Sequence, residues 1–336
     1  MSKLHDIARA IVAPGKGILA ADESSGTIEK RLSSIGVEST EDRRRFYREM
    51  LFTTDGVEEF ISGVILYDET IRQNAEDGTP LREILSSRGI IPGIKVDAGA
   101  KDMANFPGEK ITEGLDGLRE RFNEYAGLGA EFAKWRAVIT IGDGIPTDTC
   151  IEANAEALAR YAALAQEAGI VPIVEPEVLM DGDHDIDTCY SVTSRTLTAL
   201  FERLAAHRVD IEGTLLKPNM VLPGKGNRTA PPDEVAEATI RCFKETVPEA
   251  LPGIVFLSGG QTDEEATANL NAMNAMGPHA WELSFSYGRA LQAASLKAWG
   301  GDDANRAAGQ QAFYHRSKMN SLARNGSWTE EAENAA

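Results

Sequence analysis

Lys217 ends a short apolar run and is the residue whose type and setting best suit covalent chemistry. The surrounding stretch covers residues 212–220, in which Lys217 is followed by Pro218-Asn219-Met220. An amine at the carboxyl end of a buried strand lies in a pocket, where desolvation favours its neutral, nucleophilic form, and such an amine can condense with a carbonyl. Pro218 lacks a backbone donor and biases Lys217 toward extended geometry, so we expect the strand to end here. The alternative is a lysine that merely flanks a strand.

Short apolar runs, most of which end in polar or charged residues, alternate along the chain with segments of helical spacing. The runs cover residues 18–21, 63–67, 90–96, 131–138, 170–174, 212–220, 254–257 and 280–285. Segments in which apolar residues recur every three or four positions include 115–128, 153–165 and 192–204. This alternation of buried strands and helices predicts an α/β fold, a single (β/α)8 or TIM barrel.

The two ends of the chain lie outside that repeat. Residues 6–12 form a short helix candidate before the first strand, and the segment from Asp302 onward reads as one helix followed by polar residues. We therefore expect one domain over residues 1–325, with extra N-terminal and C-terminal helices, and a polar tail over residues 326–336.

A parallel barrel gathers its reaction groups at the carboxyl ends of its strands. The residues that we expect to meet there are Asp22, Lys95, Lys134, Arg136, Glu175, Lys217, Ser258, Ser286 and Arg289. A second cation beside Lys217 would favour its neutral form, and Lys134 or Lys95 can supply it. Glu175 and Asp22 are candidates to move protons as a carbinolamine forms and loses water. For each carboxylate the alternative is an ion-pair partner that neutralises a buried lysine.

Two neighbouring loops carry the pattern of a phosphate site. Ser258-Gly259-Gly260 precedes a capping box at Thr262, and glycines before a helix leave backbone N–H groups free for an anion. The next loop, Ser286-Tyr287-Gly288-Arg289, adds a hydroxyl, a glycine and a permanent cation. Barrel enzymes often bind phosphate between the loops after strands seven and eight. Lys30-Arg31 on the first loop is a weaker candidate for a second phosphate, since such a pair is usually a solvated helix face.

The bulk properties exclude several classes of protein. The formal charge of −18 disfavours binding to nucleic acid or to an anionic membrane. No apolar run approaches the roughly 18 residues of a membrane span, and the N-terminus lacks a signal-peptide core, which predicts a cytoplasmic protein. Cys150, Cys189 and Cys242 have unrelated spacings and suggest neither a disulfide framework nor a zinc site.

With these residues assembled, the chain closely resembles the class I fructose-1,6-bisphosphate aldolases, the Schiff-base enzymes of glycolysis. The matching stretches are residues 17–24, 93–97, 132–136, 174–177, 181–185, 215–220, 257–261 and 285–290. They run in order along nearly the whole chain.

The resemblance implies a role for each candidate residue. Lys217 would form the imine with the ketone of a phosphosugar, Glu175 would be the acid and base for imine formation and dehydration, and Asp22 would handle the proton of the hydroxyl next to the breaking bond. Lys134 would tune the nucleophile. The phosphate nearer the lysine would be held by Ser258, Gly259, Gly260, Ser286 and Arg289. Arg31 and Lys95 would hold the far end of the substrate. Arg136 and Gly288 are further substrate-binding candidates. The resemblance also implies a homotetramer that needs no cofactor and no metal ion.

The C-terminus departs from one branch of that family. Animal members end in a mobile tail whose last residue is a tyrosine that takes part in proton transfer to the enamine. This chain ends Asn334-Ala335-Ala336, and its last tyrosine is Tyr314. We expect the enamine here to be protonated by another group or by water.

Two other readings remain open at this point. A metal-dependent aldolase would need clustered histidines, but the five histidines are scattered and only His184 lies among acids. A non-catalytic scaffold on an aldolase fold would be free to lose Asp22, Lys134, Glu175 and Lys217, all of which are present.

Overall fold

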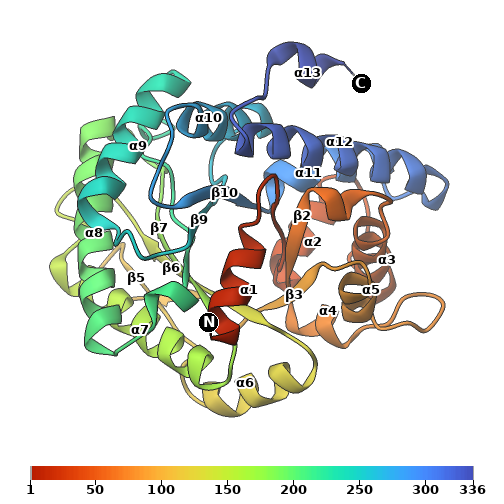
Figure 1. The fold of residues 1–336 in the computed structure, drawn as a ribbon, viewed down its shortest axis with the longest axis horizontal. Coiled ribbons are helices and arrows are strands. Elements are labelled where there is room, and N and C mark those ends of the chain that lie inside the picture. Colours follow the sequence, from red (N-terminus) through yellow and green to blue (C-terminus); the bar gives the residue numbers. More distant parts are fainter. Residues whose placement is uncertain (1, 336) are drawn as a thin grey trace.

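Eight parallel strands close into a barrel in the computed structural model, which describes residues 2–335 (Figure 1). Around the barrel the strands follow the order β1-β10-β9-β8-β7-β6-β3-β2. Their bounds are β1 Gly17–Ala21, β2 Ile61–Leu66, β3 Ile91–Lys95, β6 Phe132–Ile139, β7 Val171–Val178, β8 Leu215–Leu216, β9 Gly253–Phe256 and β10 Glu282–Tyr287. The expected (β/α)8 barrel is therefore confirmed, with each strand beside the next one along the chain.

Helices surround the barrel and extend it at both ends of the chain (Figure 1). Their bounds are α1 Lys3–Ile11, α2 Ser25–Ser33, α3 Glu41–Phe52, α4 Asp68–Arg72, α5 Leu81–Ser87, α6 Leu118–Gly127, α7 Asp148–Glu167, α8 Ile186–Ala206, α9 Pro232–Thr246, α10 Asp263–Ala275, α11 Arg289–Trp299, α12 Arg306–Arg324 and α13 Glu330–Asn334. The expected capping box opens α10, where Thr262 and Glu265 each accept from the other's backbone N–H. None of the helices within residues 2–335 has the length and apolar character that crossing a membrane requires.

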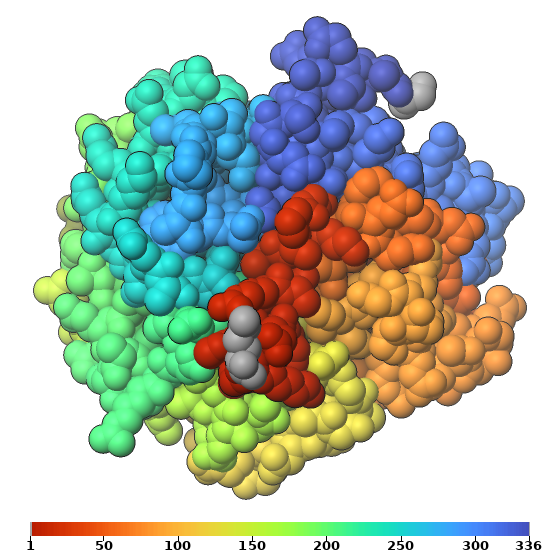
Figure 2. Space-filling view, viewed as in Figure 1, coloured from red at the N-terminus to blue at the C-terminus, as the bar shows by residue number. Residues whose placement is uncertain are grey.

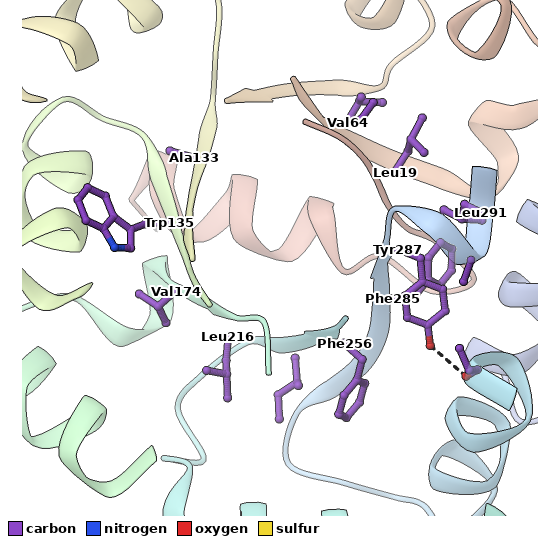
Figure 3. Close-up of a cluster of buried hydrophobic side chains, with 14 of the residues drawn as sticks. Leu19, Val64, Ala133, Trp135, Val174, Leu216, Phe256, Phe285, Tyr287 and Leu291 are labelled. Atoms are coloured by element: carbon purple, nitrogen blue, oxygen red, sulfur yellow. Dashed lines mark hydrogen bonds between the residues drawn. The ribbon is translucent and has the colours of Figure 1, made fainter. Parts of the chain in front are cut away.

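Alternate residues of each strand face either the barrel interior or the surrounding helices, as the two-residue period of a strand requires. Ile18 and Ala20 of β1 pack inside the barrel with residues such as Phe132 and Ile173. The next residue of β1, Leu19, faces the helices instead. It belongs to the larger cluster of Figure 3, with Trp135, Val174, Leu216, Phe256 and Tyr287. Both layers are almost fully buried, so the strands are held rigidly from both sides.

Helix α1 covers the amino-terminal end of the barrel. Its apolar residues Ile7, Ala8 and Ile11 are buried in the same cluster as the interior side chains of the strands. In the space-filling view the red N-terminal residues lie at the centre of this face (Figure 2). The carboxyl ends of the strands open on the opposite end of the barrel, and their polar residues meet there.

Three local features differ from the expectation. β7 continues through Glu175 and Glu177 to Val178, because the long strand β6 pairs with it along its whole length. β8 has only two residues, Leu215 and Leu216, out of the apolar run 212–220. A short antiparallel pair, β4 Ala100–Asp102 and β5 Lys110–Thr112, follows β3 and was not expected.

The residues after α12 also differ from the expected polar tail, because they contain regular structure. They include the short helix α13, seen at the upper edge of Figure 1. The carboxylate of Glu333 on α13 pairs with Arg316 of α12, and its other oxygen accepts from Trp328 Nε1 at 2.8 Å. Trp328 N in turn donates to Asn271 Oδ1 on α10 at 2.9 Å. These contacts hold the end of the chain against α10 and α12.

Candidate active site

A cavity of about 550 Å³ occupies the carboxyl end of the barrel. The cavity is lined by Asp22, Arg31, Lys95, Lys134, Arg136, Glu175, Lys217, Ser258, Gly259, Gly260, Ser286, Gly288 and Arg289, all of which were predicted for the site. Lys30, the other member of the predicted Lys30-Arg31 pair, is exposed and does not line it. Most of these residues lie on barrel strands or in the loops that follow them, whereas Arg31 comes from α2. Barrel closure therefore brings side chains from distant parts of the chain to one mouth.

Strand periodicity aims the central charged side chains into this mouth. Lys134 and Arg136 are two residues apart on β6 and so point to the same side, while Trp135 between them points out to Tyr161 in the helix layer. Arg136 is the register partner of Glu175 on β7. Lys217 follows β8, and its backbone N–H still donates to Val174 O at 2.8 Å, so its Cα keeps the position of a strand residue.

A chain of alternating charges links four residues at the closed end of the cavity. Lys217 Nζ lies 3.3 Å from Glu175 Oε1, and the other oxygen of Glu175 lies 3.2 Å from Lys134 Nζ. Lys134 Nζ also lies 2.7 Å from Asp22 Oδ2. Glu175, Lys134 and Lys217 are each at most 4% exposed. Water therefore screens these charges weakly, and each one depends on its neighbours.

Asp22 and Glu175, the two carboxylates among these four charged residues, are held in their ionised form. Burial acts to raise the pKa of Asp22, but the charges of Lys134, Lys217 and Lys95 outweigh it and bring that pKa below its ordinary value. Burial also acts to raise the pKa of Glu175, and the charges of Lys134, Lys217 and Arg136 again outweigh it, so this pKa is lowered as well. Burial acts to lower the pKa of Lys134, but Asp22 and Glu175 reverse that effect and raise it. Asp22 and Glu175 are therefore proton acceptors at neutral pH.

The two cations expected to act on Lys217 are themselves paired with carboxylates. Lys134 lies between Asp22 and Glu175, and Lys95 Nζ lies 3.2 Å from Asp97 Oδ1. Their positive charge is balanced locally instead of being directed at Lys217 alone. The ammonium group of Lys134 also orients the carboxylates of Asp22 and Glu175, because it pairs with both.

Two glycine-containing loops form the side of the cavity next to β9 and β10. Gly260 adopts a left-handed backbone with φ +81°, which lets the loop turn into α10. Arg289 begins α11, and its Nη2 donates to Gln261 O at 2.7 Å, which joins the two loops. The Ser286 hydroxyl is buried and has no hydrogen-bond partner among residues 2–335. The N-cap residue Gly288 has no side chain, so it cannot cap the first N–H groups of α11.

Arg31 lies on the same side of the cavity as these loops. A side chain at Gly288 would place its Cβ 3.5 Å from Arg31 Nη2. The other terminal nitrogen of Arg31 pairs with Glu23. The sequence could not show this, because Arg31 lies on α2, remote from Gly288 in the chain. The sequence analysis assigned Arg31 to the far end of the substrate, whereas in the structure Arg31 lies beside the loop that follows β10.

Three acidic residues of the cavity were not assigned a role from the sequence. Glu177 pairs with Arg136, Asp97 pairs with Lys95, and Glu23 pairs with Arg31. Each lies within two residues of the carboxyl end of a strand and of a residue that was predicted, so strand position was the available signal. No group of three or more His, Cys, Asp or Glu side chains in the described part of the chain is arranged to hold a metal ion.

Comparisons with known proteins agree with one another. The family model described as fructose-bisphosphate aldolase class-I matches residues 3–336. The chain is 60% identical over 330 residues to the probable fructose-bisphosphate aldolase class 1 of Xanthomonas campestris pv. campestris, covering 98% of this chain and 99% of that one. It is 54% identical over 324 residues to the cytosolic fructose-bisphosphate aldolase 6 of Arabidopsis thaliana, covering 96% and 90%.

A solved structure gives the same result for the fold. The fructose-bisphosphate aldolase of Plasmodium falciparum, solved in complex with TRAP and a small-molecule inhibitor, superposes with a TM-score of 0.96 at 49% sequence identity. The match covers 97% of this chain and 95% of that chain. A likeness of this extent in sequence, family model and fold leaves one assignment: the chain belongs to the class I fructose-bisphosphate aldolase family.

Proposed function

We propose that this chain cleaves fructose 1,6-bisphosphate reversibly to dihydroxyacetone phosphate and glyceraldehyde 3-phosphate, with Lys217 as the nucleophile. The family membership gives the reaction, and the buried chain Lys217–Glu175–Lys134–Asp22 is the observation that supports these residue roles. The amine of Lys217 adds to the C2 ketone of the open-chain sugar and forms a carbinolamine. Loss of water then gives a protonated imine, which withdraws electrons from the neighbouring carbons.

Glu175 is the acid and base for those first steps. Its Oε1 faces Lys217 and its Oε2 faces Lys134, so one carboxylate contacts both the nucleophile and a second proton carrier. It accepts a proton from the attacking amine and returns one to the carbinolamine hydroxyl, which leaves as water. Because the pKa of Glu175 lies below its ordinary value, the carboxylate begins as the base.

Asp22 acts in the cleavage itself. Asp22 accepts the proton of the C4 hydroxyl as the C3–C4 bond breaks. The electron pair of that bond moves into the imine and gives an enamine on Lys217. The C4–C6 fragment leaves as glyceraldehyde 3-phosphate. The enamine is then protonated at C3, and hydrolysis of the imine releases dihydroxyacetone phosphate. Lys134, 2.7 Å from Asp22, stabilises the carboxylate in the ionised form that this step requires.

The phosphate on C1, near the imine, is bound by the two glycine-containing loops. Their contacts are Ser258, Gly259, Gly260, Ser286, Gly288 and Arg289. The buried Ser286 hydroxyl and the first N–H groups of α11 are donors that suit a phosphate oxygen. Arg31 is better placed for this phosphate than for the far one, because it lies beside Gly288. Lys95 and Arg136 then remain for the far end of the substrate.

Further expectations accompany this assignment. We propose one catalytic domain over residues 1–325 with residues 326–336 as an accessory segment, and we propose that the protein is a homotetramer. We also propose that it is located in the cytoplasm; the Arabidopsis relative is named as cytosolic. Light scattering tests the tetramer. The alternative of a non-catalytic scaffold predicts no turnover at all, and a metal-dependent reaction predicts loss of activity in excess chelator. We expect activity to be retained in chelator.

Borohydride trapping tests the assignment of the nucleophile. Reduction in the presence of dihydroxyacetone phosphate converts the imine into a stable secondary amine, and peptide mapping then locates the modified lysine. We expect the label on Lys217 and its loss in Lys217→Met, with turnover reduced at least about 10³-fold. Lys101→Met, at an exposed lysine of β4, is the matched control. A label on any other lysine would overturn the assignment.

A further inference from the structure

Arg48 of α3 is a buried arginine whose guanidinium contacts the loop that carries Asp22. The residue is 1% exposed. Its Nε donates to the carbonyl oxygen of Ala21 at 3.4 Å, and its Nη2 donates to the carbonyl oxygen of Glu23 at 3.1 Å. Asp22 lies between these two residues. One planar side chain therefore holds the backbone on both sides of Asp22.

The side chain of Glu23 adds further connections to the same loop. Glu23 Oε2 lies 3.6 Å from Arg48 Nη2, and Glu23 Oε1 accepts from Arg31. Gln292 Nε2, on α11, donates to Glu23 Oε1 at 2.8 Å and to the carbonyl oxygen of Ala20, also at 2.8 Å. The loop after β1 is thus bound by α2, α3 and α11 together.

An arginine at this position is costly unless its specific contacts matter. Burying a guanidinium requires desolvation, and an apolar side chain would fill the same space without that cost. A lysine keeps the charge but is a single point donor, whereas the guanidinium is a rigid fork that reaches two carbonyl groups at once. Arg48 also pairs with the carboxylates of Glu23 and Glu69, at 3.6 Å and 3.9 Å. Its two hydrogen bonds, however, go to backbone carbonyl groups on either side of Asp22, so they fix a position and do more than neutralise a charge.

We propose that Arg48 is a positioning residue for Asp22, which it holds at the distance from the C4 hydroxyl that cleavage requires. The proposal rests on the role of Asp22 proposed above. Reacting groups must be held within roughly 0.5 Å of the productive geometry, and a displacement of about 1 Å costs on the order of 10²-fold in rate. Arg48 does not contact the substrate and acts only through the loop.

The test compares two reactions that differ in their need for Asp22. Cleavage of fructose 1,6-bisphosphate needs a base for the C4 hydroxyl. Exchange of a C3 hydrogen of dihydroxyacetone phosphate with D2O needs the imine and the enamine but no such base, because this substrate has no C4. In Arg48→Lys we expect kcat for cleavage to fall about 10- to 100-fold, while the exchange rate, followed by NMR, changes by less than about two-fold.

Asp22→Asn is the reference variant, and it separates failure of the two proposals. It should lose cleavage and keep exchange. If Asp22→Asn lost both reactions equally, the role of Asp22 itself would be wrong. If Asp22→Asn behaved as expected while Arg48→Lys lost both reactions in parallel, or neither, the positioning role of Arg48 would be overturned.

Two more variants guard against a general loss of structure. Arg324→Lys is the matched control, since Arg324 is also buried, donates to Val12 O at 3.2 Å and pairs with Glu282, but at the amino-terminal end of β10. It should leave the ratio of cleavage to exchange unchanged. Gln292→Met removes the second clamp on the same loop with little change in volume, and it carries the test if Arg48→Lys does not fold. Gln292→Met should lower kcat for cleavage and leave the rate of hydrogen exchange unchanged. Equal losses in both rates would refute the proposal.

Discussion

Lys134 Nζ lies 2.7 Å from Asp22 Oδ2, although β6 and β1 are not neighbours in the barrel. The contact crosses the mouth and joins two residues for which we propose different roles in the reaction. It also explains why Lys134 cannot be regarded only as a cation that acts on Lys217. Its ammonium determines the ionisation and the orientation of the carboxylates on both sides of it.

Replacing Lys134 by methionine should therefore impair both stability and catalysis. Two buried carboxylates would lose their shared counter-ion, which should lower the free energy of unfolding by about 3–5 kcal/mol. The pKa values of Asp22 and Glu175 should rise, because burial raises them and a principal opposing charge is gone. We expect kcat to fall by roughly 10²-fold or more and the acid limb of the kcat/KM profile to move to higher pH. Lys101→Met should change neither quantity, and an unmoved acid limb in Lys134→Met would contradict the argument.

The stability of the protein should depend on pH through the same carboxylates. The pKa of Asp22 and that of Glu175 lie below their ordinary values in the folded protein, so both groups bind protons more readily when the chain unfolds. Their stabilising contribution is complete above the unfolded-state pKa of about 4 and is lost as pH falls below it toward the folded-state pKa. Urea unfolding between about pH 5 and pH 3 should show a smaller loss of stability in Asp22→Asn than in the wild type. Equal losses would show that Asp22 is not held ionised by its neighbours.

A side chain at Gly260 should disturb phosphate binding. Its Cβ would lie 2.0 Å from Met180 Sδ and 2.7 Å from Lys225 Cε, so the loop or these side chains must move. Losing one charge-assisted hydrogen bond to phosphate should raise KM for fructose 1,6-bisphosphate by about tenfold or more in Gly260→Ala. Gly89→Ala is the control, because Gly89 also has a positive φ, +73°, but nothing within 4 Å of the added Cβ. Similar KM values in the two variants would rule out a specific effect of the loop.

Ending the chain at Asn325 should lower stability and leave turnover nearly intact. None of residues 326–335 lines the cavity, whereas Glu333 pairs with the buried Arg316. Removing the segment should reduce the free energy of unfolding by about 1–3 kcal/mol, the cost of a lost charged contact, while kcat stays within about two-fold. Glu333→Gln isolates the ion pair from the rest of the segment. Abolished turnover in the truncated chain would mean that the segment takes part in protonating the enamine.

Much of the architecture was accessible from local patterns. The spacing of apolar runs predicted the barrel, and the rule that parallel strands share one carboxyl end predicted which residues would meet. The residues at which strands begin and end were harder to predict from the sequence. β7 extends through Glu175 because β6 supplies backbone partners along its whole length, and that pairing is not visible in residues 170–174 themselves.

The sequence by itself determined most of the residues at the mouth, because the two-residue period of a strand and the shared carboxyl end of parallel strands can be read from local patterns. Only the tertiary structure decided their partners. Lys134 between Asp22 and Glu175, Arg31 beside Gly288, and Arg48 behind the loop after β1 all depend on barrel closure and on the packing of α2 and α3. Such contacts join residues far apart in the chain. Their geometry is fixed by how buried elements fill space together, which no local pattern records.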